Sequence, residues 1–149
     1  MNLVLFFIGL LTCALSWAAW KGGAPERWAT ILYAAAIIAS ELVSQGAPPG
    51  QNFTVLAGPL LIVDLTLAIA LSVLTIKANR LWLIPATGCQ WLAVAGHLTR
   101  WLAPRVIPTS YAFLTMIWSW PMIVLLLIGT IAHQRRATRG EQVPGWRRS

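Results

Sequence analysis

Five long apolar stretches, separated only by short polar links, constrain this chain of 149 residues more than any other feature. Each is close to the roughly 20 residues that an α-helix needs to cross the hydrocarbon core of a bilayer. Backbone groups in lipid must be hydrogen-bonded within the protein, and the stretches lack the alternation of barrel strands, so we expect helices. The expected spans are residues 2–20, 28–44, 54–76, 81–102 and 110–132.

The composition agrees with an integral membrane protein. Hydrophobic residues make up 58% of the chain and charged residues 10%, whereas a soluble domain carries about a quarter charged residues. The links contain Gly and Pro, which are typical of helix ends. We therefore predict an all-α integral membrane protein, a bundle of five transmembrane helices within residues 1–132. Such a chain has no soluble domain for a nucleotide, a nucleic acid or a bulky polar substrate.

The distribution of Lys and Arg predicts the orientation of the bundle, because these residues are enriched in cytoplasmic loops. With the N-terminus outside, nine basic residues lie on the inner side and two, Arg100 and Arg105, on the outer side. We therefore expect the N-terminus outside and the C-terminus inside. We also expect the first span to be retained, because it lacks the basic region that precedes the apolar part of a signal peptide.

The last residues, 133–149, are polar and basic, and we predict a disordered cytoplasmic tail. A Lys or Arg near an anionic membrane surface contributes about 1 kcal/mol to attraction. The net charge of +7 is thus explained by topology and the membrane surface, and no nucleic-acid partner is expected. Docking of an acidic cytoplasmic partner is the alternative. The arginines of the tail are Arg135, Arg136, Arg139, Arg147 and Arg148.

Polar side chains inside the expected spans form the candidate functional site, because such groups are costly at membrane depth and are usually functional. The helical rise places Glu41 and His97 roughly 6 Å from the outer helix ends, and Asp64 and Gln90 near the midplane. We predict two tiers, Glu41 with His97 and Asp64 with Gln90. Arg100 joins the outer tier if its side chain turns inward.

Each tier also has a structural interpretation. An aspartic acid in a membrane helix can stay protonated and simply hydrogen-bond a neighbour, and a Glu41–His97 pair can act as a packing clasp. The functional alternative is a proton relay or a small polar site that opens to the outer face.

Motifs for other chemistry are absent from the sequence. Cys13 and Cys89 have no CxxC spacing, so we expect them to be small buried hydrophobes. His97 and His133 lie near opposite membrane faces and cannot together ligate one haem. No zinc spacing, phosphate-binding loop or nucleophile elbow is present. We therefore predict no cofactor, no metal site and no catalytic residue, and we lean against an enzyme.

Three functions remain open from the sequence. We favour a non-enzymatic accessory, assembly or scaffold subunit, because the chain is small and its helices carry small residues suited to helix packing. The second is a small oligomeric proton-coupled transporter or channel that uses Glu41, Asp64, Gln90 and His97. The third is a membrane enzyme, or a quinone or lipid binder, with a Glu41–His97 pair. The expected partners are the lipid bilayer and a membrane protein or further copies of the chain, in a bacterial cytoplasmic (inner) membrane.

Overall fold

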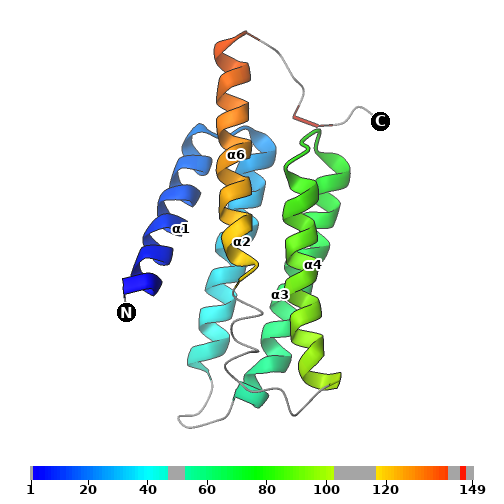
Figure 1. Ribbon diagram of the computed structural model, residues 1–149. Coiled ribbons are helices and arrows are strands. Elements are labelled where there is room, and N and C mark those ends of the chain that lie inside the picture. The colour runs from blue at the N-terminus through cyan, green and yellow to red at the C-terminus, as the bar shows by residue number, and fades with distance from the viewer. Residues whose placement is uncertain (1, 47–52, 103–116, 141–144, 147–149) are drawn as a thin grey trace.

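The computed structural model describes residues 2–46, 53–102, 117–140 and 145–146. Within these ranges the chain forms five helices and no strand element, so the predicted all-helical fold is confirmed there. Figure 1 shows the first four helices lying side by side and running alternately in opposite directions. The helices are α1 (Asn2–Lys21), α2 (Ala24–Gln45), α3 (Phe53–Lys77), α4 (Leu83–Leu102) and α6 (Ser119–Thr138).

Short turns join the helices at one end of the bundle, which we call the turn end: Gly22–Gly23 links α1 to α2, and residues 78–82 link α3 to α4. The α2 helix starts there with Pro25 and Glu26 in its first turn. Proline loses no hydrogen bond in this position, and a negative charge is favoured by the helix dipole. α3 packs against α2 and α4, and α6 packs against α4 and α1.

The packed core lies toward the turn end. Four alanines there are fully buried, and side chains this small let helix backbones approach closely. They are Ala18, Ala29, Ala78 and Ala86. The larger members of the same core are Tyr33, Leu67, Leu71, Leu74, Trp82, Leu83, Met122 and Leu126.

Two segments of the described chain, Ala24–Gln45 and Gly58–Lys77, are long and apolar enough to cross a membrane, and Leu5–Lys21 is a shorter apolar helix. Gln90 and His97 lower the hydropathy of α4, and α6 ends in polar turns. Length and composition of two helices thus favour a membrane protein. Crossing of the membrane by all five helices stays a prediction.

The last helix differs most from the sequence-based boundaries. The sequence placed a span at 110–132 and a disordered tail at 133–149. In the structure α6 begins at Ser119 and continues to Thr138, while residues 110–116 lie outside the described part. Two arginines occupy the last turn of α6, where positive charge is favoured by the helix dipole.

Part of the tail returns to the turn end. The backbone N–H of Asn79 donates to the carbonyl oxygen of Gly145 at 3.0 Å, and Ala78 and Trp146 form an isolated β-bridge. Of the predicted basic tail, Arg135 and Arg139 are exposed and Arg136 is half-buried. Arg147 and Arg148 lie outside the described residues.

Candidate functional site

Asp64 of α3 is the centre of a polar cluster that also includes Gln90 and His97 of α4. Gln90 Nε2 donates to Asp64 Oδ1 at 3.0 Å and to the Asp64 carbonyl oxygen at 3.2 Å. His97 Nε2 lies 2.7 Å from Asp64 Oδ2. The two α4 residues are two helical turns apart and therefore share a face of the helix. We call these three residues the Asp64 cluster.

The predicted Asp64–Gln90 contact is present, but His97 contacts Asp64 and not Glu41. Counted from the turn end, Asp64 lies 13 residues before Lys77, the last residue of α3, and His97 lies 14 residues after Leu83, the first residue of α4. The two residues are therefore nearly level, which the estimate from the outer helix ends did not show, because α3 has 25 residues and α4 has 20. Glu41 is exposed near the end of α2, where its Oε1 accepts a hydrogen bond from Gln45 Nε2 at 2.8 Å. The Arg100 side chain lies outside the described residues.

The Asp64 cluster adjoins a cavity of about 540 Å³. Asp64 and Gln90 both belong to the cavity wall, and the Asp64 side chain keeps 27% of its surface exposed while His97 keeps 6%. Every described helix contributes to the wall, which is largely apolar, as in Leu67, Met122 and Ile123. The cavity lies in the half of the bundle away from the turn end. On α1 its lining begins at Phe7 and on α2 it ends at Ser44, and both residues are near the helix ends that are far from the turns.

Tyr33 lines the cavity, but its polar atom is buried. The residue is 6% exposed, and its hydroxyl oxygen has no hydrogen-bond partner within the described part of the chain. Leaving a buried hydroxyl unpaired costs about 1–3 kcal/mol. Because this oxygen has no accessible surface of its own, the polar contacts of the cavity come from Asp64, Gln90 and Glu41.

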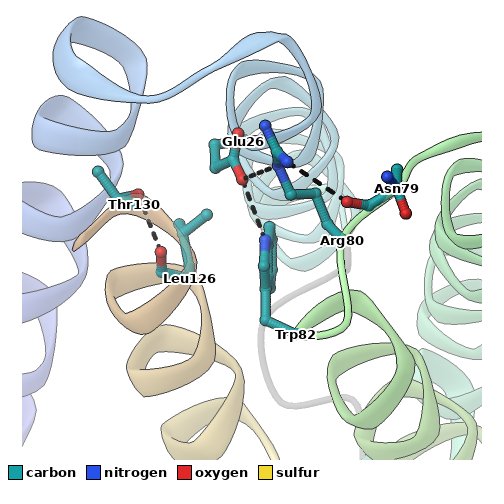
Figure 2. A network of polar contacts seen from close by, with 6 residues as sticks. All are labelled: Glu26, Asn79, Arg80, Trp82, Leu126 and Thr130. Carbon is teal, nitrogen blue, oxygen red and sulfur yellow. Dashed lines mark hydrogen bonds and ion pairs between the residues drawn. The ribbon is translucent and has the colours of Figure 1, made fainter. Parts of the chain in front are cut away.

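A second polar cluster, not anticipated from the sequence, lies at the turn end (Figure 2). Glu26 Oε1 is 3.2 Å from Arg80 Nε and also accepts a hydrogen bond of 3.2 Å from Trp82 Nε1. The Glu26 and Arg80 side chains are 0% and 4% exposed. We call these three residues the Glu26 cluster. It ties the first turn of α2 to the link between α3 and α4.

Glycines make room for the Glu26 cluster. A Cβ on Gly129 of α6 would collide with the Trp82 indole. A Cβ on Gly23 would lie 2.8 Å from His133 Cε1 and 2.9 Å from Glu26 Oε2. Glu26 and Arg80 lie in the short polar links between the expected spans. A usable signal was that one link contains a negative charge and the other a positive charge, and that both links lie at the same end of the bundle.

The described residues contain no group of three or more His, Cys, Asp or Glu side chains that could hold a metal ion. Cys13 is exposed and Cys89 is half-buried, and both are free thiols. The polar groups of the described cavity lining include two carboxylates, an amide and serine hydroxyl groups, and the imidazole of His97 lies against Asp64.

Comparison of the chain with protein-family models, curated proteins and solved structures found no match. Function is therefore argued from the two clusters and the cavity.

Proposed function

We propose that this chain is a multi-span membrane protein that binds a small amphipathic molecule in the cavity between its helices. The observation that carries the proposal is the cavity of about 540 Å³ with apolar walls and the Asp64 cluster at its edge. Ligand sites in proteins are typically about 300–1,000 Å³ in volume and mostly apolar, with a few polar groups that orient the ligand.

Membrane insertion is supported by the two long apolar helices and by large apolar side chains on the outside of the bundle. Exposed examples from α1 to α4 are Leu5, Phe6, Ile38, Leu42, Ile62, Ile69 and Leu92. The bias of basic residues supports an N-terminus outside and a C-terminus inside. In this orientation the cavity lies in the outer half of the bilayer, and we propose a bacterial cytoplasmic membrane as the location.

Ligand binding has more support than the accessory-subunit role, because the cavity has the Asp64 cluster at its edge, and a surface that only packs against a partner needs no such polar groups. A proton-coupled transporter is the second candidate. It is favoured by the 2.7 Å contact between Asp64 and His97, since a carboxylate and an imidazole in contact can exchange a proton.

The test is recovery of a bound small molecule from protein purified out of native membranes in mild detergent. Organic extracts are analysed by mass spectrometry and the protein content of the particle is determined. Ala36 is on the cavity wall, so Ala36→Phe should fill the site and remove the ligand. Ala35 is exposed and outside the described cavity lining, so Ala35→Phe is the matched control and should keep the ligand.

Equal extracts from both variants and from membranes without the protein would refute the ligand-binding proposal. A second protein in fixed stoichiometry, with no small molecule, would establish the accessory-subunit role instead. Proton-coupled transport requires in addition a flux across proteoliposomes that is lost in Asp64→Asn.

A further inference from the structure

We infer that the cavity selects a lipophilic amine in its protonated form. This inference rests on the proposed function, because it names the chemical class of the ligand for the same site. It is carried by the distribution of charge and of hydrogen-bonding atoms over the cavity wall.

Acidic side chains are concentrated at the cavity in a chain that is otherwise basic. The protein has 4 acidic and 11 basic residues. Of the three acidic side chains in the described ranges, Glu41 and Asp64 line the cavity, and Glu26 is paired with Arg80. The described lining includes no Lys or Arg. The described part of the wall is therefore negative although the whole chain carries +7.

Two features reduce this negative charge without cancelling it. His97 neutralises Asp64 when the imidazole is protonated. The N-terminus of α6, where Ser119 lines the cavity, contributes a positive charge of about one half. Glu41 is bonded only to the neutral amide of Gln45 in the described structure, so its charge remains available. A cation between apolar walls is attracted more strongly than in water, because the dielectric constant is lower.

The remaining wall groups suit an ammonium better than a carboxylate or phosphate. The rings of Phe7 and Tyr33 line the cavity, and aromatic faces attract cations. The apolar body of the amine would contact leucine and isoleucine side chains such as Leu11, Ile37 and Ile123.

Three probes with the same apolar body test the charge preference: 1-aminoadamantane, 1-adamantanol and 1-adamantanecarboxylate. Binding is measured by equilibrium dialysis against the full chain in phosphatidylcholine nanodiscs, with empty nanodiscs as the background. Neutral lipid avoids attraction of the amine to the bilayer itself. We expect the amine to bind about tenfold more tightly than the alcohol, and the carboxylate more weakly than both.

Two isosteric variants then assign the preference to the cavity carboxylates. Asp64→Asn and Glu41→Gln should each weaken amine binding, the former by about tenfold, and leave the affinity for the alcohol unchanged. Thr66→Ala is the control, because Thr66 lies on the same helix as Asp64, is exposed and is outside the described lining. If the Asp64→Asn protein does not fold, amine binding by Glu41→Gln is compared with that by Thr66→Ala.

The outcomes separate the two proposals. Binding of the alcohol or the carboxylate as tightly as the amine would overturn the inference and keep the ligand-binding function. Amine binding that is the same in both carboxylate variants and in Thr66→Ala would also overturn the inference. If the protein binds none of the three adamantane probes and the extracts contain no native ligand, the binding function itself would be refuted.

Discussion

The Glu26 cluster and the Asp64 cluster both place two nitrogen donors on a carboxylate, but they differ in partner and surroundings. Glu26 is fully buried, and both donors share one oxygen, Oε1. Asp64 is partly exposed, and each of its oxygens has its own donor. The cation beside Glu26 is the guanidinium of Arg80, whereas the partners of Asp64 are an imidazole and a neutral amide.

The surroundings of the Glu26 cluster and the Asp64 cluster also differ. Close-packed glycine and indole contacts enclose the Glu26 cluster, whereas the Asp64 cluster adjoins a cavity. A permanently charged pair without free space serves to hold helix ends together. A carboxylate and an imidazole at the edge of a cavity have room to contact a guest. We therefore assign a structural role to the turn end and propose a functional role for the opposite half.

Removing the permanent charge at the turn end should have the largest effect on stability. Arg80→Met leaves Glu26 buried without its cation, so we expect a loss of about 3–5 kcal/mol in the free energy of unfolding. Unfolding by SDS titration in mixed micelles measures this. Arg139→Met, at an exposed arginine beyond α6, is the control and should change stability by less than about 0.5 kcal/mol.

Adding Glu26→Gln to Arg80→Met should restore part of the loss, because no buried charge is then left unpaired. A loss below about 1 kcal/mol for Arg80→Met alone would mean that water reaches Glu26. The turn end would then not be a rigid region that excludes water.

The close approach of α6 to Trp82 supplies a second, smaller test. Gly129→Ala places a methyl group against the indole, and we expect a loss of about 1–3 kcal/mol from overpacking. Gly88→Ala is the matched control, because nothing lies within 4 Å of the added carbon. Because alanine has a better helix propensity than glycine, Gly88→Ala should leave stability unchanged or raise it by up to about 1 kcal/mol. Equal effects of the two changes would show that Trp82 is free to move aside.

Much of the helical architecture could be predicted from the sequence, because the length of an apolar stretch and the position of a polar link are both visible in neighbouring residues. The first four helices begin and end near the predicted bounds. The start of α6 at Ser119 was missed because residues 110–132 were taken as one apolar stretch, although Pro121 lies in the first turn of α6, where a proline loses no hydrogen bond of the helix. The helical turns after Ala132 were missed because the polar residues there were taken to mark the end of the helix. A helix with charged side chains can continue outside lipid.

The candidate site was predicted in part. Depth along the helices was sufficient to pair Asp64 with Gln90. It failed for His97, because depth was counted from the outer ends of two helices of different length, whereas counting from the turn end that they share places Asp64 and His97 at nearly the same level. The Glu26–Arg80 pair spans 54 residues of sequence, so only the packing of helix ends brings the two charges together. The cavity depends on side chains from every described helix, and no local pattern predicts it.

Asp64→Asn should have a smaller effect on stability than Arg80→Met or Gly129→Ala, although it weakens amine binding. The asparagine keeps the size of the side chain and one oxygen acceptor, so we expect a loss of at most about 1.5 kcal/mol, the value of a single hydrogen bond. The same SDS titration used for Arg80→Met measures it, with Thr66→Ala as the reference. A loss as large as that of Arg80→Met would show that α3 and α4 depend on this contact to stay together. Asp64 would then hold the fold as Glu26 does, and the division between a structural end and a functional half would fail.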